Sequence, residues 1–285
     1  MKITDIEIRA CRHRDPVMKD SEMRDGKKSD LEFLVITFHT NEGLSTSTFG
    51  FAGRGASMAG EIANSIFKPF FIGRDPLYRE KHWHEYRMAD RWWNHAPIYS
   101  YGPFDINCWI LSALAANQPL YKYMGAYRDS VPIYGSSLVL PTPEAYAKEA
   151  IEYKKRGFNA YKLHPPGKYD FDLESHIAVR KAVGDNFKLM SDPVAPYTFE
   201  EALRFGRELE KLNYHWYEEP LYDENFHGLR ELTRILDIPI IGTEVIAKHP
   251  YSVAECISTR VVDMVRADVS WSGGITATLK TAHLA

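Results

Sequence analysis

The pattern of hydrophobic and polar residues changes near residue 130. Before that point, alternating apolar and polar positions predict strands at residues 3–8 and 31–38, and apolar residues at helical spacing predict a helix at 104–124. After it, short apolar runs alternate with amphipathic stretches, several of which end in glycine, as helices often do. We therefore expect an N-terminal α+β domain, residues 1–128, followed by a β/α domain, residues 129–285.

The second part reads as repeated strand–helix units that run in one direction. Such units favour a parallel β/α barrel over an open dinucleotide-binding sheet, because the sequence has no GxGxxG turn. The predicted strands span residues 131–136, 160–164, 187–192, 215–220, 238–244 and 263–270. Active sites of β/α barrels form at the carboxyl ends of their strands, so catalytic residues are expected at those ends.

Three acidic residues end three successive strands at equal intervals. A distance of 26 residues separates Asp192 from Glu218 and also Glu218 from Glu244. This is about the length of one strand–helix unit, so the three carboxylates should converge. A single acid after a strand is more often a helix cap. With acids at 38 of 285 positions, however, three chosen positions would all be acidic only about 0.2% of the time. Convergent carboxylates predict a divalent metal site, and Mg²⁺ fits best.

The strand that precedes the acid series ends in a polar pair. Residues two apart in a strand share a face, so Lys162 and His164 should enter the barrel mouth while Tyr161 and Leu163 face the helices. A lone lysine at a strand end is commonly a surface residue, and a lone histidine commonly a packing residue. Beside a metal, the two are candidates for an acid/base pair. A further acid, Asp268, ends the sixth predicted strand.

Composition narrows the choice of partners. The chain has 35 basic and 38 acidic residues and a net charge of −3, with no basic stripe for nucleic acid. No stretch approaches the roughly 20 apolar residues of a membrane span, and the start lacks a secretory segment. The cysteines, Cys11, Cys108 and Cys256, are scattered and lack CxxC spacing, which argues against disulfides or a zinc site. We expect a cytoplasmic protein that acts on a small molecule.

These motifs resemble those of the enolase superfamily, in its mandelate racemase and muconate lactonizing enzyme branch. The match lies in the order Lys-x-base, Asp, Glu in YEEP, Glu in GTE, and Asp before a Gly-Gly turn in ADVSWSGG. The resemblance implies a modified (β/α)7β TIM-like barrel with an N-terminal α+β capping domain. It implies Mg²⁺ ligands at Asp192, Glu218 and Glu244, and an acid/base pair at Lys162 and His164.

The resemblance also raises an expectation about the end of the chain. Asp268 resembles the residue that orients a catalytic histidine on the following strand. The chain stops at TAHLA, in the helix after the sixth strand, and His283 lies in that helix and not at a strand end. A six-stranded open barrel would expose two sheet edges. We therefore expect a barrel truncated after its sixth strand, with the C-terminal units and a second catalytic base absent.

Two positions depart from the pattern of the family. His164 stands where relatives usually carry lysine, and imidazole has a reference pKa of about 6.5 against about 10.4 for lysine, so it needs less tuning to act as a base. Val194 stands where relatives often carry a polar amide, which removes one expected hydrogen bond to the substrate.

The chemistry implied is abstraction of a proton α to a carboxylate, which gives an enediolate that Mg²⁺ stabilises. Loss of a β-hydroxyl then gives dehydration, whereas return of the proton gives racemisation or epimerisation, and ring closure gives cycloisomerisation. Two polar loops, one with Arg14 and one at residues 51–55 with Arg54, favour a sugar acid and offer candidate substrate-binding residues, although loop charges are commonly only solvated. A non-catalytic carboxylate-binding or structural homologue is the alternative of another class. The family also implies a homo-oligomer.

Overall fold

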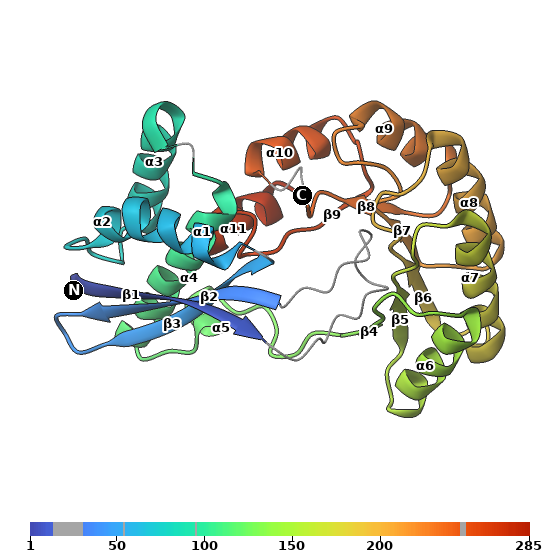
Figure 1. Ribbon diagram of the computed structural model, residues 1–285, viewed down its shortest axis with the longest axis horizontal. Coiled ribbons are helices and arrows are strands. Elements are labelled where there is room, and N and C mark those ends of the chain that lie inside the picture. Colours follow the sequence, from blue (N-terminus) through green and yellow to red (C-terminus); the bar gives the residue numbers. More distant parts are fainter. Residues whose placement is uncertain (14–30, 54, 95, 246–248) are drawn as a thin grey trace.

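Two sheets of opposite type organise the chain. The computed structural model describes residues 1–13, 31–53, 55–94, 96–245 and 249–285. In these residues a three-stranded antiparallel sheet, in the order β1-β2-β3, precedes a six-stranded parallel sheet in the order β4-β5-β6-β7-β8-β9. Figure 1 shows the antiparallel sheet with its helices on one side of the molecule and the curved parallel sheet on the other. The change of pattern near residue 130 thus falls between two kinds of sheet.

The antiparallel sheet buries one face against helices. On β2, Leu34, Ile36 and Phe38 alternate with more exposed residues and join a core with Phe67 and Phe104 from the helices that follow. The strands are β1 (Ile3–His13), β2 (Leu31–Thr40) and β3 (Ser45–Gly53), and the helices are α1 (Ala56–Ile62), η2 (Ala63–Phe67), α2 (Lys68–Phe71), α3 (Arg79–Ala89), η3 (Asp90–Asn94), α4 (Ile98–Ala115) and α5 (Leu120–Tyr123).

Strand β3 corrects the sequence prediction of two strands in this part. Its run STSTFGFAG is rich in Ser, Thr and Gly and shows little apolar alternation. Its backbone nevertheless pairs with β2 from Phe33↔Phe51 to His39↔Ser45. The loop predicted at residues 51–55 is therefore wrong for residues 51–53, because pairing with a neighbouring strand and not hydrophobicity makes this segment a strand.

The helix predicted at residues 104–124 is also corrected. Helix α4 begins at Ile98, before the predicted start, and ends at Ala115. Asn117 then takes a left-handed φ of 49°, and Pro119, which has no N–H to donate, precedes the separate turn α5.

The six parallel strands all occur where they are predicted, but each is shorter. The sixth shows the largest difference, since only residues 264 and 265 of the predicted 263–270 pair with a neighbour. The strands are β4 (Gly135–Ser136), β5 (Ala160–Leu163), β6 (Lys188–Ser191), β7 (Trp216–Glu218), β8 (Ile240–Gly242) and β9 (Met264–Val265), and the helices are α6 (Pro143–Lys155), α7 (Tyr169–Val183), α8 (Phe199–Lys211), α9 (Phe226–Ile235), α10 (Pro250–Ser258) and α11 (Gly274–Leu284).

Local signals set the helices that cover this sheet. Helix α8 starts with a capping box in which Thr198 and Glu201 exchange hydrogen bonds, and α7 ends at Gly184 with a φ of 78°. Figure 1 shows α6, α7, α8 and α9 along the outer side of the sheet. On β5, Tyr161 and Leu163 are fully buried in the core formed with these helices. This confirms the face predicted for them and leaves the opposite face for Lys162.

Helix α11 joins the two parts of the chain. Asp105 of α4 is 1% exposed, and it accepts hydrogen bonds from the backbone N–H (2.9 Å) and the hydroxyl (2.7 Å) of Thr276 in the first turn of α11. A carboxylate satisfies the free N–H groups at a helix start. The approach is so close that a Cβ on Gly274, whose φ is 93°, would lie 2.3 Å from Asp105 Oδ2.

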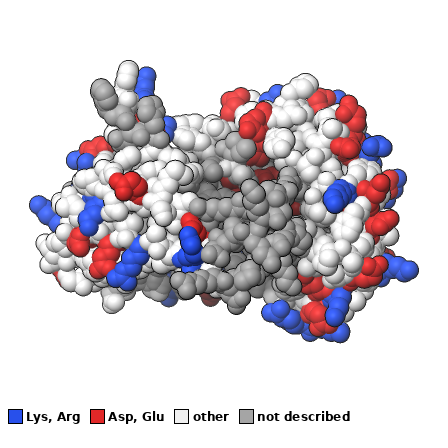
Figure 2. Space-filling view, in the orientation of Figure 1, with Lys and Arg blue, Asp and Glu red and all other residues white. Residues whose placement is uncertain are grey.

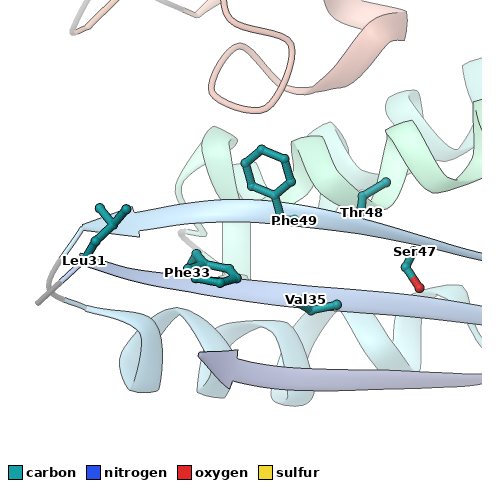
Figure 3. Close-up of a pocket in the computed structure, with 6 residues that line it drawn as sticks. All are labelled: Leu31, Phe33, Val35, Ser47, Thr48 and Phe49. Atoms are coloured by element: carbon teal, nitrogen blue, oxygen red, sulfur yellow. The ribbon is translucent and has the colours of Figure 1, made fainter. Parts of the chain in front are cut away.

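The described surface carries mixed charge and an apolar hollow. On the face shown in Figure 2, basic and acidic side chains are interspersed. A hollow of about 520 Å³ lies along β2 and β3, and the described residues that line it have no ionisable side chain (Figure 3); they are Leu31, Phe33, Val35, Ser47, Thr48 and Phe49. In the described part of the chain, no helix is both long and apolar enough to cross a membrane.

Candidate metal and acid–base site

The sequence-predicted residues meet at the carboxyl edge of the parallel sheet. Lys162 lies in β5 and His164 directly after it, Asp192 directly follows β6, Glu218 ends β7, and Glu244 comes shortly after β8. Neighbouring strands pair in parallel, so these ends share one edge. The 26-residue spacing of the acids therefore reflects one residue for each strand end.

Lys162 links two of the acids in a buried cluster. Its Nζ donates hydrogen bonds to Asp192 Oδ2 (2.7 Å) and Glu218 Oε2 (2.9 Å). All three residues are buried. Burial alone would lower the pKa of Lys162, but the two carboxylates outweigh it and raise that pKa. Burial likewise would raise the pKa of Asp192, but the hydrogen bond from His164 and the charge of Lys162 hold it low. The pair of Lys162 and Asp192 is therefore ionised.

His164, directly after β5, contacts the same carboxylate, that of Asp192. Its Nε2 lies 2.9 Å from Asp192 Oδ2, as the two-residue strand period predicts. Its Nδ1 lies 2.7 Å from the carbonyl oxygen of Ser137. Because a carbonyl can only accept, Nδ1 carries a proton and donates it. This bond fixes the ring with Nε2 facing the cluster. Nε2 donates to Asp192 while it carries a proton, and it can accept a proton from a substrate once that proton has been lost.

Arg266, which belongs to none of the predicted site motifs, completes the cluster. Its Nη1 contacts Glu218 Oε1 and lies 2.8 Å from Glu244 Oε2 and 3.7 Å from Asp192 Oδ2. Burial raises the pKa of Glu244, and the guanidinium opposes that rise. The sequence could have placed Arg266 at this site, because Arg266 lies in the last predicted strand, and the end of that strand must lie at the same edge of the sheet.

Two further residues at this edge escaped prediction. Trp216 Nε1 donates to Glu218 Oε2 at 3.2 Å, and this contact follows from the same two-residue period. Glu219 is 5% exposed, and burial, followed by the charge of Asp223, raises its pKa to about 8. Its Oε1 accepts a hydrogen bond from the backbone N–H of Glu244 at 3.3 Å. Strand alternation would send Glu219 away from this edge, but its φ of 41° breaks the alternation.

The remaining predicted residues have different positions. Asp268 follows β9, and its Oδ1 accepts hydrogen bonds from the backbone N–H groups of Ser270 (2.7 Å) and Trp271 (3.2 Å), so it stabilises the turn before α11. A catalytic role for Asp268 stays a prediction. Arg14 and Arg54 lie outside the described residues.

The donor set fits a divalent cation. Asp192, Glu218 and Glu244 converge on a single positively charged atom, Nη1 of Arg266, which stands where a cation can neutralise all three. Asp192 Oδ1 is buried and has no hydrogen-bond partner among the described residues. Hard carboxylate oxygens are the ligands Mg²⁺ prefers. As arranged, the described residues hold no group of three His, Cys, Asp or Glu side chains at metal-binding spacing. Lys162 and Arg266 lie between the carboxylates instead.

Comparison with known proteins relates the chain to enzymes. Residues 145–285 match a family model described as enolase C-terminal domain-like. The chain is 30% identical to the arabinonate dehydratase of Saccharolobus solfataricus, over 83% of this chain and 66% of the relative. It is 28% identical to the L-talarate/galactarate dehydratase of Salmonella typhimurium, over 94% of this chain and 69% of the relative. The chain thus spans about two thirds of the length of these curated relatives. A racemase and an epimerase are also among its relatives.

A solved structure extends the likeness to the fold. The D-glucarate dehydratase of Agrobacterium tumefaciens, crystallised in complex with magnesium, superposes with a TM-score of 0.87 at 32% identity, over 100% of this chain and 78% of that chain. The α/β fold with its parallel sheet is therefore shared with enzymes that act on small carboxylates.

Proposed function

Because the chain belongs to the mandelate racemase and muconate lactonizing enzyme branch of the enolase superfamily, we propose that it forms the metal and base site of an enzyme that dehydrates a sugar acid. The observation that carries this proposal is the meeting of Lys162 and His164 with the acid series at one sheet edge. Sugar-acid dehydratases among the relatives support the substrate class. The activity proposed is that of the whole protein.

The three acids supply the metal ligands. Asp192, Glu218 and Glu244 would hold Mg²⁺, since carboxylates from three separate strands suit a hard cation better than a soft one. When bound, Mg²⁺ neutralises the negative charge that develops on the substrate carboxylate as the α-proton leaves. A magnesium complex of a related dehydratase supports this choice of metal.

His164 removes the α-proton. The C–H bond breaks, its electron pair moves toward the carboxyl carbon to give the enediolate, and the proton passes to Nε2, which is unprotonated at this step. Ser137 holds the opposite side of the ring through Nδ1, so Nε2 stays directed at the cluster. The positive charge of Lys162 stabilises the adjacent anion. A positioned base of this kind contributes roughly 10²- to 10⁴-fold to the rate.

Dehydration follows when the enediolate expels the β-hydroxyl group. The C–O bond breaks, the proton on Nε2 of His164 goes to the departing oxygen, and water leaves. The resulting enol becomes a 2-keto-3-deoxy acid. One base can therefore serve both steps on one face of the substrate, whereas racemisation needs a group on each face. Lys162 lies in β5 and His164 directly follows it, so these two candidate bases can serve the one-face reaction.

Other reaction classes remain the alternatives. A racemase or epimerase would return the proton, and relatives of both kinds exist. A cycloisomerase would close a ring, and a non-catalytic homologue would only bind the carboxylate. The retained acid series and the His164 contact to Asp192 support the enzyme over the binding protein.

The proposal extends to the rest of the chain. Residues 129–285 would form units of a (β/α)7β barrel, and residues 1–128 would cap its mouth, with Arg14 and Arg54 contacting the hydroxyls of the sugar acid. Asp268 would orient a second catalytic group. The superposition with the magnesium-bound dehydratase supports the barrel. We also propose a cytoplasmic homo-oligomer.

A deuterium-exchange screen tests the proposed function. The protein is incubated in D₂O with MgCl₂ and a library of sugar acids, and NMR follows the α-proton while a carbonyl assay follows the 2-keto-3-deoxy product. Loss of the α-proton signal with keto-acid formation supports the dehydratase. Exchange with inversion and no keto acid indicates a racemase or epimerase. The absence of both for every acid overturns the enzyme assignment.

A further inference from the structure

One nitrogen of Arg266 lies where the three carboxylates converge. It contacts Glu218, lies 2.8 Å from Glu244, and lies 3.7 Å from Asp192. These three residues come from three different strand ends, and they are the ligands that the proposed function assigns to Mg²⁺. The guanidinium and a metal ion therefore claim the same carboxylate oxygens.

The two cations cannot share this place. Mg²⁺ binds oxygen at about 2.0–2.1 Å, so ligands on one ion must close in more tightly than the spread of contacts around Nη1 allows. Arg266 also cannot lose its charge to make room, because a guanidinium stays protonated in proteins. It can leave only by moving its side chain.

The balance of charge favours replacement of the Arg266 guanidinium by Mg²⁺ over binding of Mg²⁺ beside it. Asp192, Glu218 and Glu244 bring three negative charges, and Lys162 and Arg266 bring two positive charges within the same set of contacts. Replacing the guanidinium with Mg²⁺ gives three of each sign, whereas adding Mg²⁺ beside it would leave an excess of positive charge in a buried place.

The cluster offers one cation that is able to leave. The side chain of Lys162 is 2% exposed, whereas that of Arg266 is 30% exposed. The root of Arg266 is fixed, because its backbone N–H donates to the carbonyl of Gly242 (2.8 Å) and its carbonyl accepts from the Thr243 hydroxyl (2.9 Å). Thr243 itself has a φ of 82°, an unusual backbone for a β-branched residue. The side chain can thus swing into solvent from an anchored backbone.

We propose that Arg266 is an exchangeable internal cation that holds the three carboxylates together in the metal-free protein and must leave them when Mg²⁺ binds. This inference rests on the metal site of the proposed function. Arg266 therefore sets the affinity for the metal by competing with it, and it stabilises the protein before the metal arrives. Removing the guanidinium should therefore strengthen Mg²⁺ binding and lower the stability of the metal-free protein.

The test compares Mg²⁺ binding and stability in matched variants. Isothermal titration with MgCl₂ alone gives the Kd of the wild type, Arg266→Gln, Arg266→Lys and Arg260→Gln. Arg260 is the control, because it is an exposed arginine that pairs only distantly with Asp263 at 3.5 Å. Thermal unfolding of each protein with and without MgCl₂ gives the second measurement.

The expected result is tighter binding by a less stable protein. Arg266→Gln should lower the Kd for Mg²⁺ about tenfold or more, lower the Tm of the metal-free protein, and gain more Tm from MgCl₂ than the wild type gains. The Kd and Tm of Arg266→Lys should lie between those of the wild type and Arg266→Gln. The Kd and Tm of Arg260→Gln should match those of the wild type. Folding of Arg266→Gln only in the presence of MgCl₂ would also support the exchange.

Other outcomes overturn the inference in distinguishable ways. If the wild type binds Mg²⁺ and Arg266→Gln binds it no more tightly, Arg266 is a fixed structural partner and the metal site stands without the exchange. If both Arg266 variants fail to fold even with MgCl₂, the same conclusion follows. If neither the wild type nor Arg266→Gln binds Mg²⁺, the metal site of the proposed function fails together with this inference.

Discussion

Two regions of the molecule bury carboxylates, and they compensate for the charge in different ways. At the strand ends, Asp192 is paired with the cationic Lys162 at 2.7 Å, and its pKa is held low against burial. At the junction of α4 and α11, Asp105 accepts hydrogen bonds from two neutral groups of Thr276, and burial raises its pKa to about 7.

The difference shows what each region can do. A buried carboxylate costs free energy unless a cation or several donors compensate for it. Paired cations keep a carboxylate ionised, which is the form that a metal binds. Neutral donors compensate for the charge only in part, so Asp105 is suited to a fixed joint between two parts of the chain. The cluster at the strand ends is suited to the exchange of its partners.

The largest expected effect follows from removing a charge from the cluster. Asp192→Asn should weaken Mg²⁺ binding and dehydration by more than about 100-fold, because even residues that only support a metal ligand cost 10- to 100-fold when they are changed. Isothermal titration and the keto-acid assay measure the two effects. Glu149→Gln, on α6, is the control, since burial alone shifts the pKa of Glu149. Unchanged Mg²⁺ affinity in Asp192→Asn would remove Asp192 from the metal site.

The next effect separates the base from the metal ligands. His164→Asn keeps a donor that can reach the carbonyl of Ser137 but has no nitrogen that takes up a proton. We expect α-proton exchange at saturating MgCl₂ to slow by roughly 10²- to 10⁴-fold, while Mg²⁺ affinity falls by no more than the roughly 10- to 100-fold cost of losing a partner of a metal ligand. NMR exchange rates and titration calorimetry measure the two. Exchange at the wild-type rate would mean that another group is the base.

The sequence predicts the ligand acids more reliably than their partners. Asp192 and Glu218 are visible because acids at equal intervals end apolar runs, and parallel strands bring such ends together. Arg266 has no comparable signature, since its importance comes from contacts between strands far apart in sequence. Glu219 is hidden for a local reason, because its φ of 41° turns a side chain that alternation assigns to the other face.

The fold likewise divides into strands that their own apolar runs predict and strands that only pairing with a neighbour determines. The predicted ends of β5 and β6 hold to within about one residue, because Leu163 and Leu189 belong to runs buried between sheet and helices. Strand β3 could not be predicted in this way. Its register from Phe33↔Phe51 onward is set by backbone bonds to β2 and not by its own apolar pattern.

A smaller effect is expected when a tryptophan is replaced by phenylalanine, a change that can be made in both regions. Trp216→Phe keeps an aromatic ring against Tyr134 but removes the donor to Glu218. We expect Mg²⁺ affinity to fall about 10- to 100-fold, the usual cost of losing a partner of a metal ligand. The matched control is Trp109→Phe, which removes an indole donor to Thr276 at the junction. The control should lower the Tm and leave Mg²⁺ affinity unchanged. Equal effects of the two variants on Mg²⁺ affinity would contradict the separation of the regions.

The smallest expected effect is a pH dependence of the unfolding free energy that arises from Asp105 at the junction of α4 and α11. Folding raises the pKa of Asp105 from 3.8 to about 7, so between these values the folded protein holds a proton that the unfolded chain has released. Stability must then fall as pH rises through this window, and the loss is complete above the folded pKa. The Asp105→Asn variant has no such titration. Relative to that variant, the wild type should lose about 1.4 kcal/mol of unfolding free energy between about pH 6 and about pH 8.

Urea unfolding at the two pH values measures this difference. Thr276→Ser serves as the control, because it keeps the backbone and hydroxyl donors to Asp105 and should therefore keep the pH dependence of the wild type. Parallel pH profiles for the wild type and Asp105→Asn would mean that Asp105 is ionised throughout. A carboxylate that stays ionised at the junction would show that neutral donors can hold a buried charge there, and the contrast with the cationic cluster at the strand ends would then lose its physical basis.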